Sequence, residues 1–237
     1  MGMAKAARKA QAPYKFVDSA QIGRIFLALH NPRFEPVETE AEAIERLVTK
    51  EDVVPLARDI VRHGLDPLQR FALTPIGKVR GGETTYWVDE GNRRICALKL
   101  LADSDLAPPR HRKTFEKLAT EWSPITNVSA VVFNDRDTLR LWLDRTHSGP
   151  QSGVGRKSWD AEQKQRFSGG TKNKLAQAVL DYAEAEKMIT KEERQGKLTT
   201  AQRFLSPEAF QETLGLDQSD PDRLQRTRPK AEFDAML

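Results

Sequence analysis

The segment Tyr86–Leu101 constrains the fold more than any other stretch of the chain. It reads YWVDEGNRRICALKLL and begins with aromatic and β-branched residues that favour a strand. After Gly91, the apolar residues Ile95, Leu98 and Leu101 are spaced three apart, which is the periodicity of a helix face. A glycine permits the sharp turn between two such elements. The segment therefore predicts a strand, a tight turn and a helix, a unit typical of α/β folds.

The same turn predicts a binding site for an anion. The first N–H groups of a helix lack partners within the helix and lie at the positive end of its dipole. Arg93 and Arg94 add guanidinium groups that suit phosphate oxygens, although arginine in a first helical turn opposes the dipole. Two interpretations are open: the arginines bind phosphate, or they form surface ion pairs with Asp89 and Glu90.

The chain as a whole predicts two domains, because its 237 residues exceed one typical domain and its pattern changes near residue 150. Helices are predicted within residues 35–50, 53–63, 95–101, 115–122 and 135–146. Strands are predicted within residues 22–29 (or a short helix there), 68–74, 84–88 and 128–133, the last buried on both faces. After residue 158 only helices are predicted, within residues 159–167, 173–188, 199–205 and 207–214. We therefore expect a disordered or basic arm over residues 1–20, an α/β domain over residues 21–150 and an all-helical domain over residues 151–237.

The turn at Gly91 resembles the phosphate-binding turn of the ParB/sulfiredoxin superfamily. In that superfamily a strand leads into G-x-R-R and then into a helix rich in Ala and Leu, and Asn92 here replaces the acidic residue of the G-E-R-R form. Upstream, Asn31–Arg33 reads N-P-R where such chains carry an N-P element, and Gly64–Leu68 reads GLDPL and resembles their G-L-x-x-P. The resemblance covers roughly residues 22–105, under half of the chain.

The resemblance implies an α/β (α+β) ParB/sulfiredoxin-like domain with a mixed sheet, followed by an all-helical domain. It implies that the first domain binds a nucleoside triphosphate, CTP or ATP with Mg²⁺, and that the nucleotide gates a homodimer. The phosphate-binding residues that it implies are Gly91, Asn92, Arg93, Arg94, Asn31, Arg33, Arg145 and Thr146.

The position of its cysteine distinguishes this chain from the sulfiredoxins. A sulfiredoxin carries its reactive cysteine directly after the glycine, where this chain has Asn92, so sulfiredoxin activity is not expected. Cys96, the only cysteine, lies where the helix is expected to face the core. A single cysteine also excludes an internal disulfide framework.

A glycine-rich basic stretch follows the α/β half. Residues 148–156 contain three glycines, and residues 136–174 hold nine Lys or Arg against four Asp or Glu. The loop either binds an anion, with His147 beside it as an acid or base, or is a flexible linker whose histidine caps a helix. Arg156 and Lys157 are candidate contacts for DNA.

Three aromatic residues accompany this basic stretch. Trp159 is a candidate for stacking on bases, whereas Trp142 and Phe167 are expected in the core.

Two short helices near the C-terminus are compatible with a helix-turn-helix, with Arg203 as a candidate DNA contact. Glu208 and Glu212 make the second of these helices acidic, which is unfavourable against phosphates. The pair is therefore either a DNA-reading motif or a packing or dimerisation module.

Carboxylates beside the turn point to enzyme chemistry. Glu90 is a candidate ligand for Mg²⁺ and, together with His147, a candidate catalytic residue. The first hypothesis is a ParB-like nucleotide-binding switch or NTPase that acts on or with DNA. The alternatives are a ParB-like metal-dependent DNA nuclease and a small-molecule kinase of the free-serine-kinase type. The four histidines are scattered without the spacing of a zinc site.

The total charge does not decide among these hypotheses. With 38 Lys or Arg and 34 Asp or Glu, the net charge of +4 permits an anionic partner without requiring one. The chain has no run of 18 apolar residues, and no apolar signal segment follows the basic start. We therefore expect a cytoplasmic protein, bacterial or phage-encoded, without a membrane partner.

Overall fold

The computed structural model describes residues 12–78, 82–169, 173–217 and 224–237. The chain divides into two compact units, residues 1–148 and residues 149–237. The division lies two residues from the boundary expected near residue 150.

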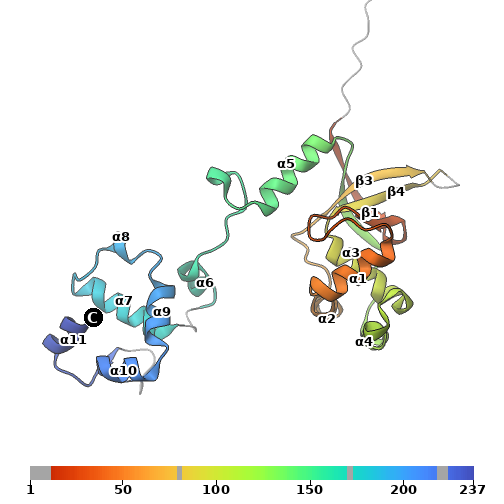
Figure 1. Ribbon diagram of the computed structural model, residues 1–237. Coiled ribbons are helices and arrows are strands. Elements are labelled where there is room, and N and C mark those ends of the chain that lie inside the picture. Colours follow the sequence, from red (N-terminus) through yellow and green to blue (C-terminus); the bar gives the residue numbers. More distant parts are fainter. Residues whose placement is uncertain (1–11, 79–81, 170–172, 218–223) are drawn as a thin grey trace, which may run out of the picture. The chain divides into compact units, whose positions relative to one another are not determined.

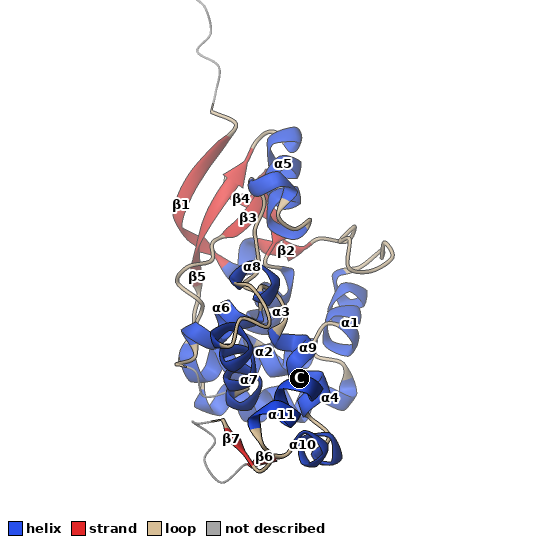
Figure 2. Ribbon diagram, turned by 90° about the vertical axis from the view of Figure 1, so that its left-hand side faces the viewer, coloured by secondary structure: helices blue, strands red, loops and turns tan. Residues whose placement is uncertain are grey.

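Five strands form one mixed sheet in the first unit, in the order β1-β5-β3-β4-β2 (Figure 2). The pairs β1/β5 and β3/β4 are antiparallel, whereas β3/β5 and β2/β4 are parallel. The strands are β1 (Tyr14–Gln21), β2 (Ile25–Leu27), β3 (Phe71–Lys78), β4 (Thr84–Glu90) and β5 (Asn127–Phe133). The predicted mixed α/β class is confirmed for this unit.

Four helices gather on one side of this sheet (Figure 1): α1 (Glu40–Lys50), α2 (Val53–His63), α3 (Asn92–Ala102) and α4 (Pro109–Glu121). A fifth helix, α5 (Arg136–His147), follows β5, and the short 3-10 helices are η1 (Ile22–Arg24) and η2 (Ser104–Leu106). Helix α3 is buried almost all round, as expected for a helix packed between a sheet and other helices. Cys96 is fully buried within it, so its predicted core position is confirmed.

The predicted arm over residues 1–20 is wrong from Tyr14 onward, because Tyr14–Gln21 forms β1. Most side chains of this strand are exposed, so the sequence has no apolar face from which the strand could be predicted. Its order comes from backbone pairing with β5. Residues 1–11 lie outside the described part of the chain.

The prediction that residues 128–133 are buried on both faces holds only in part, because Phe133 is buried on the second face but Ser129 is exposed. Burial alternates along β5: Val128, Ala130 and Val132 are buried, whereas Ser129 is exposed. At Ser129 the strand therefore packs through one face only, which is the usual pattern for a strand with an antiparallel neighbour.

The second unit is built mainly from short helices. They are α6 (Ala161–Phe167), α7 (Lys174–Ala185), α8 (Lys191–Arg194), α9 (Leu198–Leu205), α10 (Glu208–Leu214) and α11 (Lys230–Met236), preceded by the 3-10 helix η3 (Gln151–Gly153). The expected all-helical domain also contains a pair of two-residue strands, β6 (Leu216–Asp217) and β7 (Gln225–Arg226). These strands are too short to leave a periodic pattern in the sequence.

Two aromatic residues predicted in the core lie at the surface instead. Trp142 is 43% exposed on α5, where Arg145 lies over its ring, and Phe167 is 77% exposed and leans against Trp159. Leu139 is the only buried residue of α5, so the apolar face of that helix is only partly covered by the described residues.

Within the described ranges, no helix combines the length and the apolar character that are needed to cross a membrane.

Candidate functional site

The turn between β4 and α3 requires a glycine. Gly91 has a φ of +100°, a region that L side chains rarely adopt. A Cβ atom at this position would lie 2.5 Å from Cδ1 of Phe71 and 3.0 Å from an Arg94 nitrogen. Both the backbone conformation and the close approach of β3 therefore exclude a larger residue.

Asn92 ties the turn to two strands. Its side chain is buried; Oδ1 accepts a hydrogen bond from the Ala28 N–H at 3.0 Å, and Nδ2 donates to the Val88 carbonyl at 2.8 Å. An amide is suited to this position because it both accepts and donates, which an ionised acidic residue does not do. The Asn92 side chain thus has a structural role in addition to its predicted place in the phosphate-binding turn.

Arg94 fastens the turn to the start of β3. Its guanidinium lies 4.4 Å from the centre of the Phe71 ring and donates to the carbonyls of Gln69 (3.1 Å) and Arg70 (3.4 Å). It also faces Glu90 Oε1 at 3.5 Å, so the ion-pair interpretation holds for this arginine. Burial lowers the pKa of Arg94, and the neighbouring Glu90 carboxylate partly opposes that effect.

Arg93 points to the end of α1 instead. Its Nε donates to the Glu51 carbonyl, and its Nη2 donates to the Asp52 carbonyl at 3.2 Å. Arg33 reaches the same place, because its Nη1 lies 3.1 Å from Glu51 Oε2. Asn31, which is buried, accepts the Arg33 N–H at 3.0 Å and fixes the approach of that segment. The structure thus brings three of the predicted phosphate residues, Arg93, Arg33 and Asn31, to one corner of the first unit.

Glu90 and His147 form a close pair, with 2.7 Å between Glu90 Oε2 and His147 Nε2. The two residues are 57 positions apart in the chain, and α5 brings the histidine back to the end of β4. The exposed fractions of the side chains are 30% for Glu90 and 47% for His147, so both remain accessible to a substrate or to water. A carboxylate that orients an accessible imidazole is a common arrangement for proton transfer.

Asp89 is an extra residue in β4. Ala72 pairs with Glu90 and Leu73 pairs with Val88, so Asp89 forms a β-bulge between them. Its Oδ2 is buried without a hydrogen-bond partner. Burial raises the pKa of Asp89, while the Thr74 hydroxyl and the Arg136 guanidinium act in the opposite direction. The bulge places this buried carboxyl directly before the Glu90–Gly91 turn.

The other predicted residues are not joined to the turn. Arg145 lies 5.0 Å from the centre of the Trp142 ring, and Thr146 Oγ1 donates to the Trp142 carbonyl at 2.8 Å. No described hydrogen bond or ion pair links either residue to Gly91–Arg94. The predicted DNA contacts Arg156, Lys157 and Arg203 are exposed and belong to the second unit.

The sequence did not reveal the two residues that Arg93 and Arg94 contact, Glu51 and Phe71 respectively. Their contacts with Arg93 and Arg94 span long stretches of chain, and no local pattern connects the partners. The only signal was indirect: the dipole disfavours an arginine in a first helical turn, which indicates a role other than stabilising its own helix.

A site for Mg²⁺ was predicted at Glu90. Among the described residues no group of three or more His, Cys, Asp or Glu side chains is placed to hold a metal ion. Mg²⁺ that accompanies a nucleotide is commonly held by one or two carboxylates together with phosphate oxygens. Glu90 is the carboxylate that would serve here, and a metal ion would have to share its oxygens with Arg94 and His147.

No protein-family model matches this chain, and a search of curated proteins finds no significant match.

Proposed function

We propose that the first unit binds the phosphates of a nucleoside triphosphate, CTP or ATP, at the Gly91–Arg94 turn. On this proposal the protein is a ParB-like nucleotide-dependent switch or NTPase that works on or with DNA. The observation that carries the proposal is the meeting of Arg33 and Arg93 at Glu51, beside the glycine turn that opens α3. Two guanidinium groups next to a helix N-terminus suit a polyphosphate better than any uncharged ligand.

The two arginines of the motif have different tasks in this proposal. Arg94 keeps its bonds to Gln69 and Arg70 and maintains the shape of the turn. Arg93 is only half-buried, and it exchanges its two backbone carbonyl partners for phosphate oxygens when the nucleotide arrives. Charge-assisted bonds to phosphate are stronger than bonds to neutral carbonyls, so the exchange is favourable.

Hydrolysis is assigned to the Glu90–His147 pair. Glu90 orients the imidazole through the 2.7 Å contact, and His147 accepts a proton from the attacking water at the ring nitrogen that does not face Glu90. Glu90 is also the residue that would hold Mg²⁺, which supplies charge neutralisation to the phosphates when bound.

Isothermal titration calorimetry with CTP, ATP and GTP in the presence of Mg²⁺ tests the proposal. We expect one of these nucleotides to bind and Arg93→Ala to weaken binding about tenfold or more, as for the loss of a charge-assisted bond. The matched control is Arg46→Ala, which removes an exposed arginine on α1 without a described side-chain partner. The proposal fails if none of the three nucleotides binds, or if Arg93→Ala and Arg46→Ala behave alike.

A second measurement separates hydrolysis from binding. His147→Gln should lower phosphate release while leaving nucleotide affinity within about twofold, because the histidine acts on water. If nucleotide turnover is absent but supercoiled plasmid is nicked in a metal-dependent manner that Glu90→Ala abolishes, the nuclease alternative replaces the NTPase.

A further inference from the structure

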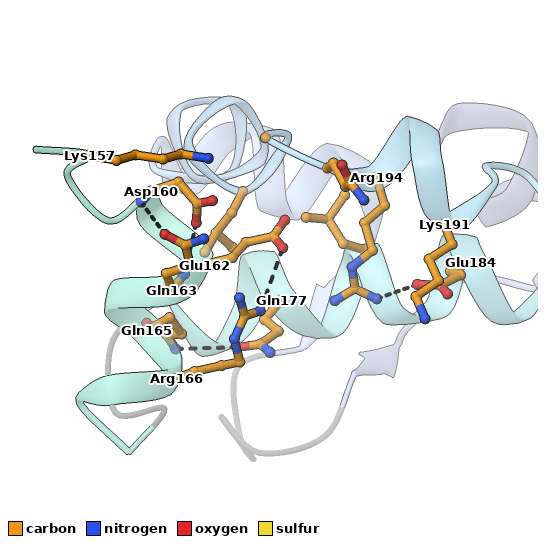
Figure 3. A pocket seen from close by; sticks show the side chains of 14 residues that line it. Lys157, Asp160, Glu162, Gln163, Gln165, Arg166, Gln177, Glu184, Lys191 and Arg194 are labelled. Carbon is orange, nitrogen blue, oxygen red and sulfur yellow. Dashed lines mark hydrogen bonds and ion pairs between the residues drawn. The ribbon is translucent and has the colours of Figure 1, made fainter. Parts of the chain in front are cut away.

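The second unit carries an open cavity of about 510 Å³ between α6, α7 and the segment from α8 to the start of α9 (Figure 3). This volume lies in the range of sites that hold small molecules or single nucleotides. Leu180 and Leu198 supply the apolar part of its wall, and most of the other lining side chains are polar or charged. We call it the α6–α7 cavity.

Most of the charge inside the α6–α7 cavity is already balanced. Arg194 pairs with Glu184 at 2.6 Å and with Asp181, and Arg166 lies 3.9 Å from Glu162. One acceptor is left over: Glu162 Oε1 is buried and has no hydrogen-bond partner. A buried carboxylate oxygen without a donor is costly, and 24% of the Glu162 side chain is exposed, so a turn of the carboxylate lets it accept a hydrogen bond from an occupant of the cavity.

Four glutamine side chains also line the cavity. Gln165 is buried and its Nε2 donates to Gln177 Oε1 at 3.3 Å, while Gln163 and Gln195 line other parts of the wall. A glutamine amide offers a donor and an acceptor side by side, which is the pattern that matches the edge of a nucleobase, and a carboxylate accepts from an exocyclic amino group. Glu162 with these amides therefore suits a base that carries an amino group, as cytosine and adenine do.

The ends of the α6–α7 cavity carry unpaired positive charge. Figure 3 shows Lys157 at one end and Lys191 at the other. Both lysines are exposed, and neither has an ion-pair partner among the described contacts. A nucleotide within a strand has a phosphate on each side of its base, and two separated ammonium groups match that arrangement.

Two exposed aromatic rings belong to the same segment as Lys157, two and ten residues after it in the chain. Trp159 is 51% exposed and Phe167 is 77% exposed, and their ring centres are 4.8 Å apart. Exposed aromatic rings next to basic side chains are the usual platform on which the bases of single strands stack.

We propose that the α6–α7 cavity holds one amino-bearing base of a single-stranded nucleic acid, with Lys157 and Lys191 on the flanking phosphates. Trp159 and Phe167 stack on a neighbouring base. This site is separate from the Gly91–Arg94 turn, and it does not depend on nucleotide binding there.

Fluorescence anisotropy with short labelled single strands of dC, dA and dT, each over a series of salt concentrations, tests this proposal. We expect dC and dA strands to bind about tenfold more tightly than dT, the discrimination typical of one good hydrogen-bonded base contact. Matching rC and rA strands identify whether DNA or RNA is preferred. Equal binding of dC, dA and dT, or equal binding of a duplex, would overturn the proposal.

Two kinds of variant locate the site. Glu162→Gln replaces the acceptor with an amide and should abolish the preference for dC and dA, whereas Glu192→Gln, on the exposed side of α8, should retain it. Lys157→Gln and Lys191→Gln should each weaken all strands and reduce the slope of log affinity against log salt by about 0.7. Lys187→Gln, an exposed lysine outside the cavity, is the control.

Circular dichroism establishes that each variant is folded. Because Lys157 and Lys191 are exposed, their variants test the site even if Glu162→Gln perturbs the unit. An unchanged salt slope in both lysine variants would refute the proposal. Arg93→Ala, which disables the proposed nucleotide site, should leave binding of single strands intact, so failure of one proposal is distinguishable from failure of the other.

Discussion

The two units use charged side chains in different ways. In the first unit, Arg93 and Arg94 bond to backbone carbonyls around a tight turn, and an extensive apolar core lies beneath them. In the second unit, Arg194 and Arg166 pair with carboxylates around an open cavity, and the described core is much smaller. Arginine in the first unit therefore positions the backbone, whereas arginine in the second unit balances charge inside a cavity.

This difference predicts that the units respond differently to the loss of a core residue. Phe233→Ala removes a fully buried ring from the small core of the second unit and should cost about 4 kcal/mol. We expect this variant to unfold the second unit while the first unit retains its melting transition in calorimetry. Phe115→Ala, at a fully buried site of the first unit, should cost a similar amount but leave that unit folded, because its core is larger.

Phe204→Ala is the control for this experiment, because Phe204 is 61% exposed and its loss should be nearly neutral. A single transition that shifts as a whole in both core variants would show that the units do not unfold independently.

The glycine turn should be the most sensitive backbone position of the first unit. Gly91→Ala introduces both a strained φ and a clash with Phe71, and we expect a loss of about 3 kcal/mol in urea unfolding. Gly64→Ala at the end of α2 shares the positive φ but meets no atom within 4 Å, so it should cost less, about 2 kcal/mol from backbone strain alone. Equal losses would mean that the approach of Phe71 is unimportant.

The two adjacent arginines should differ in their contribution to stability. Arg94→Gln leaves the Gln69 and Arg70 carbonyls without their donor in a buried place and should cost about 2 kcal/mol. Arg93→Gln exposes the Glu51 carbonyl to water and should cost less than about 1 kcal/mol. Urea unfolding of the two variants side by side measures the difference, and the reverse order would contradict the assignment of Arg94 as the structural residue.

The smallest expected effect is a pH dependence at Asp89. Because burial raises its pKa in the folded state, the folded chain retains this proton to a higher pH than the unfolded chain does. The free energy of unfolding should therefore fall as the pH rises from the ordinary carboxyl pKa through the raised one. Asp89→Asn should remove this component, so the variant gains stability relative to the parent as the pH rises. A constant difference between the two from pH 4 to pH 8 would show that Asp89 does not titrate abnormally.

Local patterns predicted much of the first unit. The periodicity of Ile95, Leu98 and Leu101 indicated α3, and Gly64 indicated the end of α2, where its φ of +79° confirms the glycine stop. These signals work because the determining residues lie within a few positions of one another.

Contacts between distant segments could not be read in the same way. Arg93 donates a hydrogen bond to the Glu51 carbonyl because that carbonyl lies at the end of α1. No residue pattern around Glu51 in the sequence predicts this contact. The pairing of Glu90 with His147 was only partly foreseeable: both were candidate catalytic residues, but only the path of α5 brings them together. Trp142 and Phe167 were misplaced because large aromatic residues usually lie inside, and composition alone does not reveal an exposed one.

The placement of β1 has a consequence for how the first unit is made. Its first strand pairs with its last, with Tyr14 opposite Phe133, so this pair forms only after nearly the whole unit has been synthesised. Closing so long a loop carries an entropic cost that shorter-range contacts must offset beforehand, and such topologies fold slowly. Once the two strands have paired, the open edge of the sheet is that of β1, whose exposed Lys15 and Asp18 are charged residues of the kind that discourage pairing with other chains.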